Sequence, residues 1–168
     1  NKLPKAIPCL ANHSWQWDHV KFRIFIAEGI DDSSTNNQSC VLHVENASGS
    51  ILLSGDIEKQ AEIQLVKHYG TALKSNILVA PHHGSNTSST NTFIDTVKPE
   101  IVLFPVGYRN RYHFPHDKVV QRYLDRQILM FNTADHGAIQ YRFGLHSYSE
   151  PVTWRQHAHK LWTSATTD

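Results

Sequence analysis

The pattern of hydrophobic and polar residues changes its period part-way along the chain. In the first third, short apolar runs alternate with polar positions, which is typical of strands with one buried face. Strands are predicted over residues 20–26, 40–44 and 51–53. Turn-forming residues at 46–49 separate the last two runs, so these strands form a hairpin. A polar loop over residues 31–38 precedes them.

After Asp56 the apolar positions follow a helical period instead. A stripe with a spacing of four residues predicts a helix ended by Gly70, and it consists of Ile57, Ala61, Leu65 and Tyr69. Strands are then predicted over residues 77–80, 101–106, 128–131 and 138–143, and residues 135–137 form the turn before the last of them. Helices are predicted over residues 93–97 and 117–124, and Asp117 can cap the second helix. No repeat or domain boundary is found, so residues 1–168 form a single mixed, layered α/β domain.

The two ends of the chain lack a clear pattern. We expect residues 1–18 and 147–168 to pack loosely, and Trp15 and Trp17 to cover a sheet edge. No apolar run is long enough for a membrane span, and no signal peptide is found. The chain begins without Met, so we expect it to be a fragment of a larger protein.

Two cysteines do not predict a disulfide framework. Cys40 lies in an apolar run, and we expect it to be a buried thiol. Cys9 lies in the N-terminal stretch that shows no period.

Charge and composition limit the range of functions. With 168 residues the chain is long enough for one domain with a core. The formal net charge of +1 gives no global electrostatic argument for nucleic-acid binding. Twelve histidines are unusual, and five of them follow apolar runs, where sites form: His82, His83, His113, His116 and His136.

Metal-binding side chains follow two successive predicted strands. Asp56 comes after the apolar run 51–53, and His82 and His83 come after the run 77–80. Open α/β sheets build their sites at the carboxyl ends of strands. A carboxylate and imidazoles at neighbouring strand ends therefore predict a divalent metal site of the zinc or manganese type.

Each of these features also has a simpler interpretation. Asp56 precedes a helix and could be its N-cap, accepting backbone N–H bonds. His82 and His83 could be a turn pair, with one ring bonded to the backbone. The metal interpretation rests on finding the carboxylate and the imidazoles together, at two successive strand ends.

Six motifs occur in an order and spacing that resemble a known family. They are Asn37–Leu42, Leu52–Glu58, Ala61-Glu62, Pro81–Ser85, Thr87–Ser89 and Gly107–Tyr112. Together they resemble the C-terminal metallo-β-lactamase-like domain of ComEC-type DNA-uptake proteins. The resemblance covers roughly residues 15–145.

The resemblance implies a fold and a role. The fold is an αββα sandwich of two sheets between helices, of which this chain would hold the second half. Family members are polytopic inner-membrane channels that admit one strand of transforming DNA, and this domain is thought to degrade the other strand. The expected partners are DNA, the membrane channel of the same polypeptide and other competence proteins. We expect the domain to lie outside the bilayer, and the side of the membrane stays open.

The resemblance also assigns roles to particular residues. Asp56 matches the family's metal-bridging aspartate, and His82 and His83 match its histidine pair, one of which is the ligand. Two divalent ions, zinc or manganese, would supply the charge neutralisation and the water activation that phosphodiester hydrolysis needs. The Gly84 N–H and Ser85 would donate to phosphate.

A later loop carries further candidate residues. Arg109, Asn110 and Arg111 would hold the DNA backbone, because guanidinium matches phosphate bidentately. The two arginines could equally be solvated loop charges.

Two departures from the family pattern matter. The motif His-x-His-x-Asp-His, which carries the main metal ligands, does not occur in this chain. Asp56 and one histidine are too few for a catalytic site, so we expect the chain alone to be a poor nuclease. In the loop where many relatives have Asn-x-Tyr-x-His-Pro, Phe114 replaces the histidine. His113 or His116 would take over its role, or neither would.

Two other functions stay open at the level of sequence. One is a degenerate domain that binds DNA or a protein partner and hydrolyses nothing. The other is a hydrolase of a different phosphate ester on the same fold, because a fold does not determine the substrate.

Overall fold

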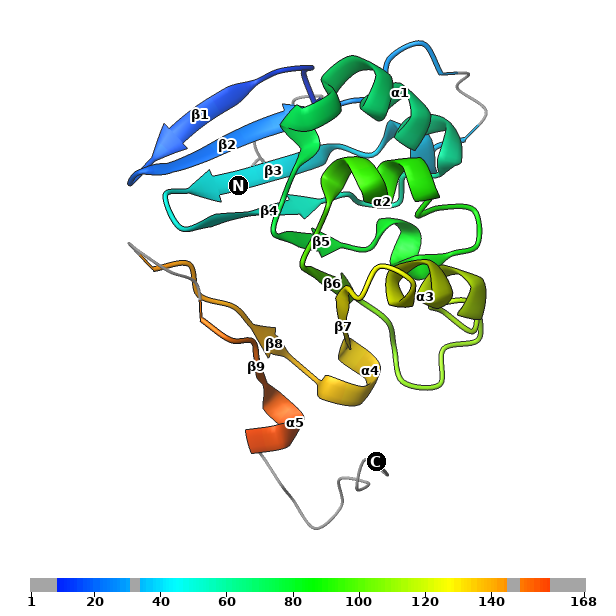
Figure 1. Cartoon of the computed structure of the whole chain (residues 1–168). Helices are drawn as coiled ribbons and strands as arrows, with labels where there is room; N and C mark the ends of the chain where they lie inside the picture. Colours follow the sequence, from blue (N-terminus) through cyan, green and yellow to red (C-terminus); the bar gives the residue numbers. More distant parts are fainter. Residues whose placement is uncertain (1–8, 31–33, 145–148, 158–168) are drawn as a thin grey trace, which may run out of the picture.

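A seven-stranded mixed sheet organises the computed structural model, which describes residues 9–30, 34–144 and 149–157 (Figure 1). Its strands lie in the order in which they occur along the chain. They are β1 (Ser14–Trp17), β2 (Val20–Phe25), β3 (Val41–Asn46), β4 (Gly49–Leu53), β5 (Ile77–Val79), β6 (Ile101–Phe104) and β7 (Leu129–Asn132).

The sheet changes from antiparallel to parallel at β4. Strands β1 to β4 pair antiparallel, and β3 and β4 form the hairpin that the sequence predicts. Strands β4 to β7 pair parallel, so their carboxyl ends lie at one edge. The chain returns between them through the helices α1 (Lys59–Tyr69), α2 (Asn91–Val97) and α3 (Asp117–Leu124).

The core lies between these helices and one face of the sheet (Figure 1). Leu52, Leu78 and Val102, which are cross-strand neighbours on β4, β5 and β6, are fully buried. The predicted stripe of α1 packs against them, since Ala61 and Leu65 are fully buried as well. The mixed α/β class is thus confirmed.

The C-terminal part departs from the predicted strand at 138–143. Strand β7 is followed by α4 (Thr133–His136), where a simple turn was expected. Only β8 (Ile139–Gln140) is a strand there, and it pairs with β9 (Val152–Thr153) in a separate small sheet, before α5 (Trp154–His157). Asn132 accepts the N–H of Asp135 and caps α4, which redirects the chain.

The prediction for the helix cap at Asp117 is wrong by one residue. The helix α3 begins at Asp117 itself, and His116 is the N-cap residue, without a side-chain capping bond. Asp117 still lies in the first turn, where its negative charge interacts favourably with the helix dipole.

The N-terminal region contains a strand that its sequence did not reveal. Strand β1 pairs with β2, and the Trp15 ring stacks on Phe22 with centroids 5.0 Å apart. The side chain of Trp17 is 76% exposed. Its four residues alternate polar and aromatic side chains, but all four are exposed, and so short a run does not by itself predict a strand. The remaining residues of the two chain ends, 1–8 and 158–168, lie outside the described ranges.

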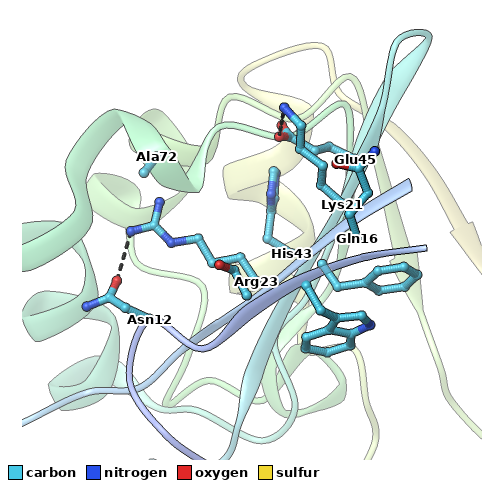
Figure 2. A pocket seen from close by; sticks show the side chains of 10 residues that line it. Asn12, Gln16, Lys21, Arg23, His43, Glu45 and Ala72 are labelled. Carbon is cyan, nitrogen blue, oxygen red and sulfur yellow. Dashed lines mark hydrogen bonds and ion pairs between the residues drawn. The ribbon is translucent and has the colours of Figure 1, made fainter. Parts of the chain in front are cut away.

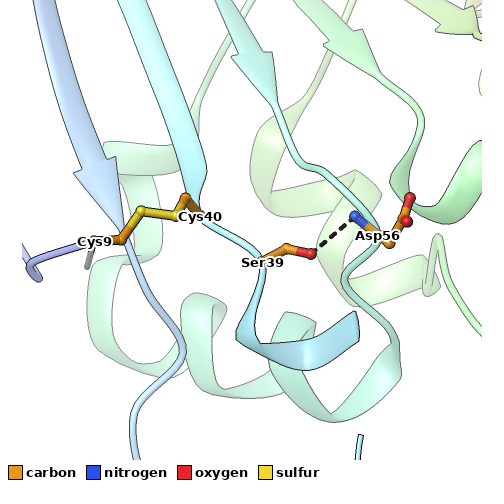
Figure 3. Close-up of a disulfide and its surroundings, with 4 residues drawn as sticks. All are labelled: Cys9, Ser39, Cys40 and Asp56. Atoms are coloured by element: carbon orange, nitrogen blue, oxygen red, sulfur yellow. Dashed lines mark hydrogen bonds between the residues drawn. A yellow bond between two sulfur atoms is a disulfide. The ribbon is translucent and has the colours of Figure 1, made fainter. Parts of the chain in front are cut away.

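The two cysteines form a disulfide, so the expectation of a buried thiol at Cys40 is wrong (Figure 3). Cys40 is exposed and precedes β3, and Cys9 precedes β1. The bond joins residues whose Cα atoms are 6.1 Å apart and that are 31 positions apart in sequence. It ties the N-terminal segment to the start of a central strand.

Removing the disulfide should destabilise the fold. Closing a loop across 31 positions restricts the unfolded chain, and the chain-entropy relation gives roughly 3–4 kcal/mol for this length. We expect the variant with Cys9→Ser and Cys40→Ser to lose about that much free energy of unfolding in a urea titration. Wild-type protein unfolded under reducing conditions is the control and should match it. A difference below about 1 kcal/mol would mean that strand pairing alone holds the segment.

A buried histidine should make stability depend on pH. His43 on β3 is 7% exposed, and its Nε2 lies 3.2 Å from the carbonyl oxygen of Lys74. Burial lowers its pKa below the usual 6.5, against the opposing effects of Glu45 and this hydrogen bond. Below pH 6.5 the unfolded chain therefore binds a proton that the folded chain does not, and stability falls as the pH falls.

His43→Gln retains an N–H donor and removes the titration. Relative to this variant, the free energy of unfolding of the wild type should decrease as pH falls below about 6.5, with a slope of at most about 1.4 kcal/mol per pH unit. Chemical denaturation across a pH series measures the difference. Parallel curves for the two proteins would contradict the expected proton linkage.

Candidate metal centre

Asp56 and His83 lie together at the carboxyl edge of the parallel strands. Asp56 follows β4 and His83 follows β5, and the imidazole Nε2 is 3.4 Å from the carboxylate Oδ1. Both side chains are nearly half exposed, at 46% and 43%. The edge therefore brings together the two residue types that the strand-end pattern singled out.

The orientation of the His83 ring is set by a backbone carbonyl. Its Nδ1 lies 2.9 Å from the carbonyl oxygen of Pro105, which follows β6. A carbonyl only accepts, so Nδ1 carries the proton and donates, and Nε2 of the neutral ring has a free lone pair. That lone pair and the Asp56 carboxylate are both acceptors, so a metal ion between them would make the contact favourable.

The spacing of the two acceptors fits a metal ion. Zinc bonds of about 2.0–2.1 Å at the tetrahedral angle place two ligand atoms about 3.3 Å apart. The observed 3.4 Å is close to this value. A hydrogen-bonded carbonyl behind a metal-binding histidine is also the usual arrangement in metal sites.

His82 is held differently from His83. Its Nδ1 lies 3.3 Å from Oε1 of Glu58 and 3.4 Å from the Thr87 hydroxyl. Its ring meets Phe114 edge to face, with centroids 5.8 Å apart. His82 is 22% exposed and still lines the cavity beside the carboxylate. The geometry therefore favours His83 as the partner of Asp56 and gives His82 a separate hydrogen-bond network.

The N-cap interpretation of Asp56 is excluded by the position of the helix. The helix α1 begins at Lys59 and its N-cap residue is Glu58. Asp56 instead has its own backbone N–H bonded to the Ser39 hydroxyl at 3.1 Å (Figure 3). Its carboxylate is left to face the cavity.

Left-handed backbone conformations shape both loops. Gly55 has φ +59°, and a Cβ there would lie 2.9 Å from Cβ of Ser39. His82 and His83 have φ of 46° and 56°, which is unfavourable for residues with side chains. A bond from the His82 N–H to the Gly55 carbonyl, 3.0 Å long, joins the two loops. Strain concentrated in this way is typical of functional sites.

A buried carboxylate supports the loop that follows the histidine pair. Glu62 on α1 is fully buried and accepts the backbone N–H groups of Ser89 and Thr90. Burial raises its pKa, which these hydrogen bonds and the charge of Arg122 oppose. Arg122 on α3 donates to the carbonyls of Ser88 and Ser89, each at 2.9 Å. Two helices therefore hold this loop in place.

The other predicted site residues lie around the same cavity or in its walls. The Ser85 hydroxyl is buried and 3.0 Å from that of Thr87. The Asn110 amide is bonded to both the N–H and the carbonyl of Phe114, at 2.9 and 2.8 Å. Arg109, Arg111 and His113 are exposed, and the ring of His116 contacts Phe114. Their contacts with substrate stay predictions.

The cavity at this edge has a volume of about 600 Å³, and its walls come from three strand ends and one loop. It is lined by Asp56, His82, His83, Pro105, Val106, Gly107, Asn110, Tyr112 and Phe114. Among the described residues, no cluster of three or more metal-binding side chains is found. Asp56 and His83 are therefore two candidate ligands within the described ranges, fewer than a catalytic zinc site needs.

A second cavity, of about 620 Å³, lies over β1 to β3 and has different chemistry (Figure 2). Its charged groups have partners in the cavity wall: Arg23 donates to the Asn12 amide oxygen at 2.8 Å, and Lys21 is 3.5 Å from Glu45. No paired acceptors face an open space there, so we place the candidate site at the carboxyl edge.

Comparison with known proteins supports the family resemblance. No family model matches the chain. Over 134 residues the chain is 37% identical to competence protein ComA of Neisseria gonorrhoeae. It is 38% identical over 117 residues to the uncharacterized protein YcaI of Escherichia coli, and 36% identical over 124 residues to ComE operon protein 3 of Bacillus subtilis. The chain is homologous to part of the ComEC-type competence proteins.

The match covers most of this chain and a small part of each relative. The match with ComA includes 80% of the chain and 19% of ComA, and the match with YcaI includes 69% of the chain and 15% of YcaI. For ComE operon protein 3 the two shares are 74% and 16%. No helix in the described ranges is long and apolar enough to cross a membrane.

Several residues that position the site were not assigned a role from sequence. Ser39, Glu58 and Glu62 all belong to the motifs shared with the ComEC-type family, which was the available signal. The role of the Pro105 carbonyl could not be predicted in this way, because every residue type has a backbone carbonyl oxygen.

Gly84→Ala should destabilise the site. Gly84 has φ +83°, and a Cβ there would lie 2.6 Å from Cβ of Pro115 and 2.9 Å from the Phe104 ring. We expect a loss of roughly 1–3 kcal/mol in free energy of unfolding, measured in urea. Gly107→Ala is the control, since a Cβ there meets nothing within 4 Å and should change stability by less than about 0.5 kcal/mol. Equal stability of the two variants would show that the Gly84 loop can move away.

Proposed function

We propose that this chain is part of a metal-dependent phosphodiesterase domain that hydrolyses DNA in a competence protein. The observation that carries the proposal is the Asp56–His83 pair, whose two acceptor atoms face each other 3.4 Å apart at the edge of the parallel strands. The names of two relatives, competence protein ComA and ComE operon protein 3, support the biological role.

The chain's own residues can perform three tasks at this edge. Asp56 and His83 hold a divalent ion, zinc or manganese, and the Pro105 carbonyl keeps the imidazole in the tautomer that a metal needs. Arg109 and Arg111 are exposed and have no carboxylate partner within the described ranges, so they are available to phosphates. The bound metal would supply charge neutralisation and water activation for phosphodiester hydrolysis.

The remaining ligands would come from outside this chain. The described residues provide two, and a catalytic zinc site needs at least three protein ligands. We propose that a His-x-His-x-Asp-His segment elsewhere in the same polypeptide completes the centre, which would then hold two ions.

The face of the sheet away from the helices is only partly covered: Ile77 and Ile101 on it are buried, whereas the next row is half-buried or exposed. This supports a second layer from the same source. Leu53, Val79, Leu103 and Phe131 form one cross-strand row on the face away from the helical core. Leu53 is 36% exposed, and Leu129, one row further along, is 58% exposed. Parallel strands are usually covered on both faces. A second sheet over this row would complete the αββα sandwich.

The wider setting is also a proposal. We place the domain outside the bilayer, attached to a membrane channel of the same polypeptide and acting with other competence proteins during DNA uptake.

Asp56→Asn should abolish metal-dependent DNA cleavage by the full-length polypeptide while the fold stays intact. The amide retains the shape of the carboxylate, but it removes the negative charge that offsets the cation. Metal content by elemental analysis and cleavage of linear DNA against a chelated control are the measurements. Asp18→Asn, an exposed turn residue beside β1, carries the same change of charge and should retain both.

The two histidines provide an independent check on the geometry. His83→Ala should lose bound metal, whereas His82→Ala should retain it. The reverse result would exchange their roles. Cleavage and metal content that survive Asp56→Asn would refute the metal role of this carboxylate. DNA binding with neither metal nor cleavage in the wild type would favour the non-catalytic alternative.

A further inference from the structure

The cavity beside Asp56 and His83 has an aromatic wall that a phosphate site does not need. The Tyr112 and Phe114 rings are nearly parallel, with centroids 5.5 Å apart and an interplanar angle of 21°. Phe114 in turn meets His82 edge to face. A continuous set of rings therefore leads from the proposed metal centre out to Tyr112, which is 56% exposed.

The wall is held rigidly by its own loop. The Asn110 side chain bonds both backbone groups of Phe114, and the His116 N–H donates to the Gly84 carbonyl at 3.0 Å. These bonds fix the loop relative to the histidine pair. The Tyr112 ring stacks on Phe114, which these bonds hold in place, and this reduces the entropy lost when a ligand packs on the wall.

Arginine guanidinium groups lie over the exposed rings, and Arg111 also donates to the Tyr112 hydroxyl. The Arg111 guanidinium lies 4.8 Å from the centre of the Tyr112 ring, and Arg109 lies 5.2 Å from that of Tyr108. Tyr108 is 59% exposed. Aromatic faces interleaved with arginines are the arrangement by which proteins hold single-stranded nucleic acid, because the rings stack on bases and the cations follow the phosphates.

The structure assigns to this cavity a nucleobase subsite: a base of single-stranded DNA packs on the Tyr112 and Phe114 wall while its phosphate lies toward Asp56 and His83. The faces of bases within a duplex are stacked on one another and cannot reach a protein ring, so the subsite selects an unpaired strand. A volume of about 600 Å³ lies within the range of small-molecule sites. The inference rests on the proposed function, since it places the base relative to the proposed metal centre.

Binding without metal tests the subsite separately from catalysis. Fluorescence anisotropy of a short labelled oligonucleotide is measured with the chain in excess chelator. Tyr112→Leu should weaken single-strand binding on the order of 5- to 150-fold, the usual effect of losing one stacked base, and leave blunt duplex binding unchanged. Tyr112→Phe, which retains the ring, should bind nearly as the wild type does.

Two controls separate stacking from general effects. Trp17→Leu removes an even more exposed aromatic residue from the far edge of the sheet and should leave the affinity unchanged. An oligonucleotide of abasic sugars should bind the wild type about as weakly as normal DNA binds Tyr112→Leu.

The possible results distinguish the two proposals. Equal single-strand affinities of Tyr112→Leu and the wild type would overturn the base subsite and leave the nuclease proposal standing. Loss of duplex and single-strand binding to the same extent would also overturn it, because the tyrosine would then only support the loop. If the wild-type chain binds no DNA of either kind while metal-dependent cleavage by the full-length polypeptide is intact, the subsite alone fails. If cleavage is absent too, the proposed function fails with it.

Discussion

Hydrogen bonds between the loops at the carboxyl edge of β4, β5 and β6 hold the candidate site together. The His82 N–H donates to the Gly55 carbonyl, and the His83 ring donates to the Pro105 carbonyl. Each bond joins residues that follow neighbouring parallel strands. Without this register, Asp56 and His83 would not lie side by side, because 27 positions separate them in sequence. The strained backbone at the two histidines persists because both neighbouring loops hold it.

Most of the fold could be predicted from periodicity, and the reason is burial. The β3–β4 hairpin and the α1 stripe face a single core, so their sequences carry the spacing of that core. Strand β1 is exposed along its whole length, and its polar–aromatic alternation covers only four residues, which is too short a run to predict a strand. The short β8–β9 pair was missed because its partners are separated by 12 positions or more, with no turn signature between them.

The candidate site was predictable to the level of residue types and no further. The rule that sites form at strand ends brought Asp56 together with the histidine pair, and it left open which histidine faces the carboxylate. That choice depends on the Pro105 carbonyl and on Glu58, which are set by tertiary packing. The buried Glu62 belongs to one of the motifs behind the family resemblance, although it does not line the cavity. Its carboxylate holds the backbone of the loop that follows the histidines.

The disulfide between Cys9 and Cys40 makes the order of this site depend on its surroundings (Figure 3). Cys40 is followed directly by β3 and preceded by Ser39, whose hydroxyl accepts the Asp56 N–H. The covalent anchor of the N-terminal segment thus lies one residue from the hydroxyl that holds the backbone of Asp56. Disulfides persist in oxidising compartments and are reduced in the cytosol. An oxidising compartment would therefore keep this carboxylate firmly anchored, and a reducing one would leave it more loosely held.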